Sequence, residues 1–137
     1  MANFSGGCLC GAIRYEVTGE PVRMAICHCD DCRKATGAAF TTNIFVNEAD
    51  LRITQGMPKQ YRHPTDSGST MTKEFCPDCG SQLFGYSSRS SGIKHVKVGT
   101  IDDASFVKPQ LEVYTVRKLP YVRLQEGITH YDKNRPS

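Results

Sequence analysis

The sequence predicts a mainly β protein, built of antiparallel sheets. Short segments that alternate apolar and polar residues recur along the chain between turn-forming residues. Seven cysteines fall into three spaced groups, a distribution typical of metal binding, and their odd number excludes a complete set of internal disulfides. The length of 137 residues fits one compact domain, which we expect to span residues 1–137.

The expected strands follow one another along the chain. Each alternates apolar and polar residues or is rich in β-branched and aromatic ones, and together they lie at residues 13–17, 40–46, 51–54, 96–98 and 111–116. Tyr15, Tyr61 and Phe75 are expected to pack the sheets. Gly, Pro, Asn and Asp separate the strands and mark the turns, so the chain is expected to fold back on itself repeatedly.

Other segments are predicted to be helical or irregular. One or two helical turns should follow the cysteine-rich segment at residues 27–32, begun by Asp30 or Asp31 and ended by Gly37. Residues 62–69 and 86–92 are polar and are predicted to be loops. The tail at residues 130–137 has little to bury and is expected to be partly loose.

Composition and charge exclude several classes of protein. No apolar run reaches the roughly 18 residues of a membrane span, and the first residues lack the basic and apolar regions of a signal peptide. We therefore expect a cytoplasmic protein with reduced thiols and no membrane partner. The 17 Lys and Arg residues are scattered, which argues against nucleic-acid binding. If seven thiolates bound two Zn²⁺ ions, the formal charge of +3 would fall to zero.

Two of the cysteine groups are pairs. Cys8 and Cys10 are two residues apart, so on an extended strand both sulfurs face the same side. Cys76 and Cys79, followed by Gly80, have the spacing of a zinc knuckle, in which a tight turn brings two sulfurs to one ion. Together the pairs complete a closed Cys₄ site, which is a structural type of zinc site.

The third group, Cys27, Cys29 and Cys32, then has three thiolates and no fourth cysteine. Three protein ligands and one free position are typical of a reactive zinc site. His28, Asp30 or Asp31 would close the site if one of them supplied the fourth ligand. In a different partition, Cys29 and Cys32 join Cys76 and Cys79 in a zinc ribbon, which strands Cys8, Cys10 and Cys27.

The ordered cysteine motifs resemble those of the glutathione-dependent formaldehyde-activating (GFA) family. The motifs are Gly7-Cys8-Leu9-Cys10-Gly11, Cys27-His28-Cys29-Asp30-Asp31-Cys32-Arg33-Lys34 and Phe75-Cys76-Pro77-Asp78-Cys79-Gly80-Ser81-Gln82-Leu83. Residues 99–103 and the Lys108-Pro109 pair resemble later landmarks of the family, so the resemblance runs from about Phe4 to about Tyr131.

The resemblance implies an Mss4-like antiparallel β fold with up to two zinc ions. It implies a structural ion on Cys8, Cys10, Cys76 and Cys79, and an open, catalytic ion on Cys27, Cys29 and Cys32. It also implies a carbon–sulfur lyase, similar to S-(hydroxymethyl)glutathione synthase, that joins formaldehyde or a similar aldehyde to glutathione or a similar small thiol. Relatives such as centromere protein V serve in chromatin or microtubule organisation, so a non-catalytic, zinc-stabilised binding module is the alternative.

Residues beyond the cysteines have two interpretations each. His28, Asp30 or Asp31 is a candidate base or a surface residue. Arg33 and Lys34 could pair with substrate carboxylates or belong to a solvated helix face. The single histidines are expected to be structural or exposed; they are His63, His95 and His130. The chain has no Trp, and Tyr114 and Tyr121 stand where relatives often carry Trp, which suggests a different substrate if these aromatics line the pocket.

Overall fold

The computed structural model describes residues 3–136, and within them β-strands are the main regular secondary structure. The strands are β1 (Phe4–Gly7), β2 (Arg14–Val17), β3 (Arg23–Cys27), β4 (Thr41–Asn47), β5 (Leu51–Gln55), β6 (Lys59–Pro64), β7 (Thr70–Phe75), β8 (Gln82–Ser87), β9 (Ile93–Lys97), β10 (Leu111–Val113) and β11 (Thr129–His130). The helix α1 spans Asp30–Thr36, and short 3₁₀ turns are η1 (Glu48–Asp50), η2 (Val98–Thr100) and η3 (Thr115–Arg117). The predicted mainly β class is confirmed.

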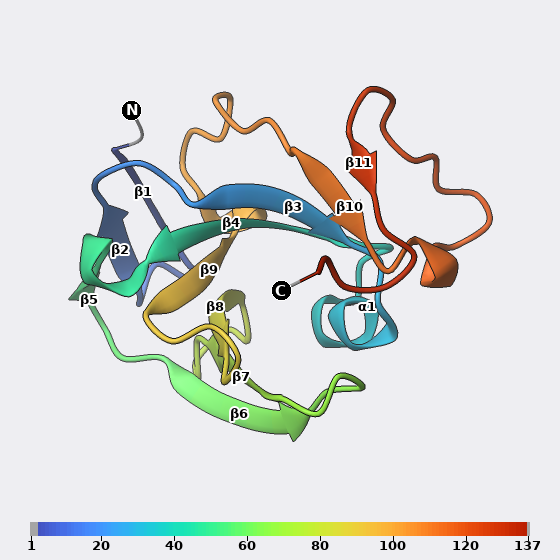
Figure 1. Cartoon of the computed structure of the whole chain (residues 1–137). Helices are drawn as coiled ribbons and strands as arrows, with labels where there is room; N and C mark the ends of the chain where they lie inside the picture. The colour runs from blue at the N-terminus through green and yellow to red at the C-terminus, as the bar shows by residue number, and fades with distance from the viewer. Residues whose placement is uncertain (1–2, 137) are drawn as a thin grey trace.

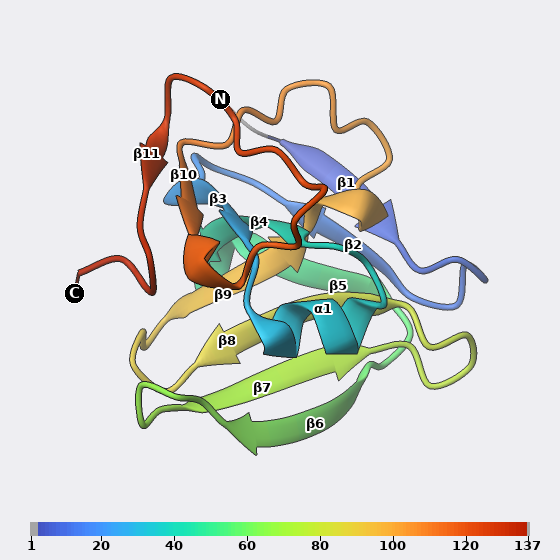
Figure 2. The same ribbon diagram turned by 90° about the vertical axis from the view of Figure 1, so that its right-hand side faces the viewer.

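The strands form two sheets. The small sheet has the order β1-β2-β5 and is antiparallel throughout. The large sheet has the order β11-β10-β3-β4-β9-β8-β7-β6, and only its β3, β10 and β11 run parallel to one another. Figure 1 shows how strongly the large sheet curves: β6 and β7 lie opposite β3 and β10, and α1 lies at one end between them. Figure 2 shows α1 in front of these strands, next to β7.

The hydrophobic core fills the space between the two sheets. Tyr15 of β2 is almost fully buried and meets the edge of the Phe84 ring at a centroid distance of 5.0 Å. Ile44 and Val96 pair across β4 and β9 and are also fully buried in this cluster. Because side chains alternate along a strand, the residues beside these core positions face the other side of the large sheet. That second face carries the polar side chains described below.

Four of the predicted strands match β2, β4, β5 and the end of β9. The expected strand at 111–116 ends at Val113, because Tyr114 has a left-handed backbone with φ of 55°. The loops predicted at 62–69 and 86–92 are wrong at one end of each, since β6 continues to Pro64 and β8 to Ser87. Tyr61 was expected to pack the sheets, but 62% of it is exposed on the edge strand β6.

The helix ends where predicted but begins differently. Gly37 takes a left-handed φ of 71° and its amide bonds to the Arg33 carbonyl, as a glycine C-cap does. The N-cap is Cys29 and not an aspartate, since the Cys29 thiol accepts a hydrogen bond from the Cys32 amide at 3.2 Å. A cysteine that is a candidate metal ligand thus caps the helix, a role that Asp often has.

Residues 131–133 of the C-terminal segment are bonded to the fold, within the tail that was expected to be partly loose. The Tyr131 amide bonds to the Glu112 carbonyl at 2.9 Å, and the Tyr114 amide bonds to the Lys133 carbonyl at 3.0 Å. These bonds hold residues 131–133 beside β10. Ser137, the last residue of the expected loose tail, lies outside the described residues.

Gly85 of β8 sits where the large sheet has room for no side chain. A Cβ atom built there would lie 2.5 Å from His95 Nε2 and 3.1 Å from the Thr72 carbonyl oxygen. We expect Gly85→Ala to lower the free energy of unfolding by about 1–3 kcal/mol through overpacking, measured as a lower urea midpoint. Gly99→Ala is the matched control, because nothing lies within 4 Å of its Cβ position. Equal midpoints for the two variants would contradict this reading of β8.

Candidate functional site

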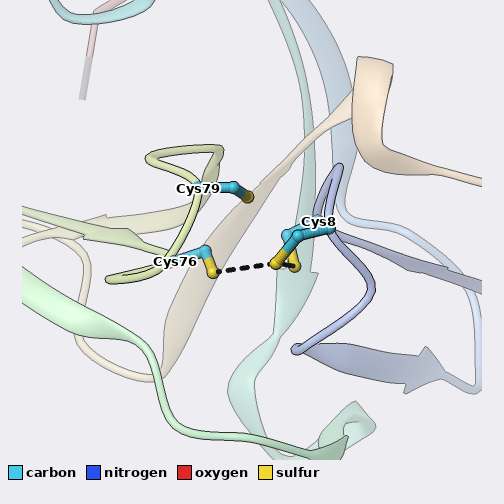
Figure 3. A group of neighbouring side chains, drawn as sticks. Cys8, Cys76 and Cys79 are labelled. Carbon is cyan, nitrogen blue, oxygen red and sulfur yellow. Dashed lines mark hydrogen bonds between the residues drawn. The ribbon is translucent and has the colours of Figure 1, made fainter.

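Four cysteines from two distant turns converge on one point. Cys8 and Cys10 lie in the turn after β1, while Cys76 and Cys79 lie in the turn between β7 and β8. Figure 3 shows the two turns facing each other with their sulfurs directed inward. The Cys8 and Cys10 sulfurs are 3.7 Å apart, and those of Cys10 and Cys76 are 3.8 Å apart. A tetrahedron of thiolates around zinc has edges of about 3.8 Å, given Zn–S bonds of about 2.3 Å. The set therefore fits zinc.

Local hydrogen bonds shape both turns of this four-cysteine site. The Ile13 amide donates to the Cys8 sulfur at 3.2 Å, and the Gly80 amide donates to the Cys76 carbonyl at 2.8 Å. Gly80 has φ of 79°, a conformation that glycine adopts without strain. The Ser81 hydroxyl, 3.2 Å from the Cys79 sulfur, is the main cause of a Cys79 pKa lowered to about 6. A thiol that ionises readily is suited to be a metal ligand.

The other three cysteines form a separate cluster at the start of α1. Cys27 ends β3, Cys29 caps α1 and Cys32 lies in its first turn. Their sulfurs lie within 4.8 Å of one another. Hydrogen bonds from Cys27 and Cys29, together with the positive charges of two nearby lysines, lower the Cys32 pKa to about 3. The structure does not bring Cys29 and Cys32 together with Cys76 and Cys79. The alternative grouping of these four cysteines in a zinc ribbon is therefore wrong.

His28 points away from this cluster, although it lies between two of its cysteines. Its Nε2 atom is 2.6 Å from a carboxylate oxygen of Glu112, and both side chains are 1% exposed. The other Glu112 oxygen accepts a hydrogen bond from the Gln125 amide at 2.6 Å and lies 3.2 Å from His130 Nε2. His28 therefore belongs to a buried network behind the cluster and is neither a fourth ligand nor a base at the site.

The two aspartates of α1 do not complete the cluster either. Asp30 is 2.7 Å from Arg33, and this pairing lowers the Asp30 pKa. Asp31 is exposed and lies 3.9 Å from His63 Nδ1. Among residues 3–136 the group of potential ligands at this point has three members, all cysteines. Arg33 and Lys34 do not line the cavity described next.

The three-cysteine cluster opens into a cavity of about 460 Å³. The second face of the large sheet forms the floor, with side chains from six neighbouring strands: Arg23, Ala25, Cys27, Asn43, Phe45, Met71, Lys73, Ser87, Ile93, His95, Lys97, Leu111 and Val113. Helix α1, residues 63–69 and the C-terminal segment add the walls. None of the four cysteines of the other site lines this cavity.

Positive charge dominates the cavity lining. Six Lys and Arg side chains line it, against three carboxylates. Lys73 and Lys97 are only 7% and 6% exposed. Burial lowers the Lys97 pKa, and burial together with these two lysines holds the His95 pKa well below its usual value. His95 is therefore a neutral imidazole within a positively charged pocket.

Tyr114 lines the cavity wall, and Phe45 and Tyr86 are further aromatic residues of the lining. Its hydroxyl donates to an Asp66 carboxylate oxygen at 2.6 Å, and burial with this bond raises its pKa. Its left-handed backbone is uncommon for a residue with a side chain, and such strain is often found at functional sites. Tyr121 is 77% exposed and does not line the cavity, so only one of the two tyrosines singled out in the sequence is at the site.

Sequence reasoning missed most of the cavity floor. His63 and His95 both line the cavity, as do Lys73 and Lys97. One signal was present: β9 reads Ile-Lys-His-Val-Lys, which puts His95 and Lys97 on one face while Val96 points to the core. Polar residues on the inward face of a central strand indicate a lined cavity, but only once the strand is known to be central.

Comparisons with known proteins identify a family. The model of the family described as glutathione-dependent formaldehyde-activating enzyme matches residues 3–117. A Phaeosphaeria nodorum protein provisionally named as such an enzyme is 29% identical over 120 residues, which cover 82% of this chain and 62% of the relative. An uncharacterised lyase of Schizosaccharomyces pombe is 26% identical over 84 residues, covering 61% of this chain and 58% of the relative. The chain thus spans about three fifths of these relatives' lengths.

A structural comparison supports the fold. A crystal structure of a Rhodobacter sphaeroides protein superposes with a TM-score of 0.57 at 22% identity, covering 93% of this chain and 98% of that one.

Within residues 3–136, no helix has the length and apolar character to cross a membrane. Since the family model covers most of the sequence and includes all seven cysteines, the chain belongs to the glutathione-dependent formaldehyde-activating enzyme family.

Proposed function

We propose that this protein is a zinc-dependent carbon–sulfur lyase that joins formaldehyde or a similar small aldehyde to glutathione or a similar thiol. One observation carries the proposal: the three-cysteine cluster opens into the cavity, whereas the four-cysteine site does not line it. The provisional names of the fungal relatives support the pair of substrates.

In this proposal the chain holds up to two zinc ions with different roles. Cys8, Cys10, Cys76 and Cys79 bind a structural ion, because four thiolates leave no coordination position for a substrate. Cys27, Cys29 and Cys32 bind the second ion and form the catalytic site. An ion with three thiolate ligands would supply a soft fourth position suited to sulfur.

The reaction is the addition of a thiol to a carbonyl group. The sulfur–carbon bond forms, the carbonyl π electrons move to oxygen, and the thiol proton is transferred to that oxygen, with no net oxidation. The cavity favours the first step, since Lys73 and Lys97 create a positive potential that stabilises a thiolate. The cavity also holds both reactants in one enclosed volume, which reduces the entropic cost of their encounter.

His63 is the residue we assign to the proton transfer. Its Nδ1 atom lies 2.9 Å from the Pro64 carbonyl oxygen and donates to it, so in the neutral ring Nε2 carries the lone pair. Nε2 has no hydrogen-bond partner among the described residues, and His63 lines the cavity. A neutral imidazole with a free lone pair can accept the thiol proton and return it to the alkoxide.

Replacing His63 tests this role. We expect His63→Phe to slow adduct formation by about 100-fold or more while the thiol still binds, because general acid–base catalysis contributes on that scale. Two-dimensional exchange NMR of glutathione and formaldehyde measures the rate at equilibrium. Tyr121→Phe is the control, since Tyr121 is exposed and lies outside the cavity lining. If both variants kept the wild-type rate, His63 would not be the proton carrier.

Cobalt substitution tests the open site. After replacement of zinc by Co²⁺, titration with glutathione is expected to add a thiolate-to-metal absorption band that saturates, because a free position accepts the sulfur. Cys29→Ala should lose this response and keep the absorption of the four-cysteine site. A wild-type spectrum indifferent to glutathione would contradict the enzyme and favour a non-catalytic binding module held together by zinc.

A further inference from the structure

Two buried lysines on the cavity floor have no carboxylate partner. Lys73 of β7 and Lys97 of β9 are both less than one tenth exposed. Among residues 3–136, no carboxylate lies within salt-bridge distance of either ammonium group. Burying a charge without a partner is costly, so proteins normally pair such groups or use them to bind a charged ligand.

The same two strands show what a paired lysine looks like. Lys94 of β9 lies on the opposite face of the sheet, 2.9 Å from the buried carboxylate of Glu74 in β7. Lys73 and Lys97 face the cavity instead, where the floor offers amide and hydroxyl groups. Thus β7 and β9 supply a counterion on one face and leave two cations on the other.

These cations lie close to the cysteine cluster. Lys73 and Lys97 line the same cavity as the three cysteines, and Lys97 stands on β9, next to β4, the strand that pairs with Cys27 of β3. Asn43, 5% exposed, pairs with Lys97 across β4 and β9 and also lines the cavity. An anion bound by Lys73, Lys97 and Asn43 would therefore sit beside the reacting atoms.

We propose that Lys73, Lys97 and Asn43 bind a carboxylate carried by the carbonyl substrate, which is then a small α-oxo acid of the glyoxylate type. This inference rests on the proposed thiol–carbonyl addition and specifies its carbonyl partner. Formaldehyde has no charged group and gives two buried lysines nothing to bind. In an α-oxo acid the carboxylate is attached directly to the reacting carbon, which matches cations placed beside the cysteines.

The carboxylates of a tripeptide thiol match a different part of the cavity. They are several bonds from the sulfur, so they reach groups farther from the reacting atoms. The cavity has such groups in its arginines, of which Arg89 and Arg117 are exposed. The reaction itself balances as before: sulfur bonds to the carbonyl carbon, the π electrons and the thiol proton go to oxygen, and the carboxylate is unchanged.

Binding of an unreactive analogue tests the lysine site directly. Isothermal titration of the zinc-loaded protein with oxamate should show binding, whereas acetamide, which lacks the carboxylate, should not bind. Lys73→Met and Lys97→Met should each weaken oxamate binding by about tenfold or more, the scale of a charge-assisted hydrogen bond. Lys59→Met, an exposed lysine of β6, should leave it unchanged. Failure of the wild-type protein to bind oxamate overturns the proposal.

Kinetics with 2-mercaptoethanol as the thiol show which substrate carries the bound carboxylate, because this thiol has no carboxylate. The rate ratio of glyoxylate to formaldehyde should fall at least tenfold in Lys97→Met. The proposal would be wrong if Lys97→Met lowered the rate only when glutathione was the thiol, because the lysine would then bind the thiol. It would also be wrong if the variant lowered the rates with glyoxylate and formaldehyde equally, because the lysine would then act on the cysteines. Oxamate binding without any adduct formation would overturn the proposed reaction and not the carboxylate site.

Discussion

Cys76→Ala is expected to give an unfolded or aggregated chain, whereas Cys29→Ala should fold. Cys76 is fully buried in the core cluster. Its sulfur lies next to that of Cys10, which is 66 residues away in the sequence, so the four-cysteine site joins two distant turns. A structural zinc ion supplies on the order of 10 kcal/mol to its domain, which is comparable to the total net stability of about 5–15 kcal/mol of a typical fold. Loss of this site therefore removes most of the stability.

Circular dichroism and urea unfolding of the zinc-loaded variants measure the difference. Cys79→Ala should behave as Cys76→Ala does, because both thiols belong to the four-cysteine site. Cys29→Ala removes a helix cap and one ligand of the cavity cluster, so a smaller loss of about 1 kcal/mol is expected from the cap. Equal unfolding midpoints for the three variants would refute the division into structural and catalytic sites.

Glu112→Ala is expected to produce the second largest effect. The Glu112 carboxylate is 1% exposed and contacts His28, His130 and the Gln125 amide. Removing one partner from a buried charged network costs about 3–5 kcal/mol. Because His28 lies between Cys27 and Cys29, the loss should also loosen the cysteine cluster in front of it.

The readout for Glu112 combines stability with local exchange. The urea midpoint should fall, and amide hydrogen exchange should rise in residues 125–131 and around His28. Glu112→Gln, which keeps the shape and an acceptor for Gln125, should lose less. Glu16→Ala is the surface control, since the Glu16–Arg52 pair is exposed and such pairs contribute about 0–1 kcal/mol. A midpoint for Glu112→Ala within the range of that control would contradict the structural role of the network.

Loss of the carboxylate site and loss of either metal site should affect different properties of the protein. Loss of the four-cysteine site should remove the fold, while loss of the three-cysteine cluster should remove thiol binding. Loss of Lys73 or Lys97 should weaken thiolate stabilisation with every carbonyl compound and, in addition, lower the rate ratio of glyoxylate to formaldehyde. These effects are separable because the four-cysteine site lies outside the cavity, and the lysines stand on strands that the core face holds in place.

The sequence by itself determined the grouping of the cysteines and the class of fold. Cys76 and Cys79 lie in a tight turn with Gly80, and Cys8 and Cys10 lie two residues apart, so short-range geometry limits which sulfurs can share an ion. Alternation in β2 and β5 likewise reveals strands, because their side chains lie on two faces with different environments. Gly37 ends α1 for a local reason too, its left-handed backbone.

Only the tertiary structure decided what surrounds the cysteine cluster. His28 is adjacent to two ligand candidates in sequence, yet the distant Glu112 directs it into a buried network. Lys73 and Lys97 meet at the cavity because β8 pairs with both β7 and β9, which places the two lysines on one curved face. The tail becomes a wall through backbone bonds to residues 112–116. Each of these placements depends on contacts between residues far apart in the chain, and such contacts leave no periodic or spaced pattern in the sequence.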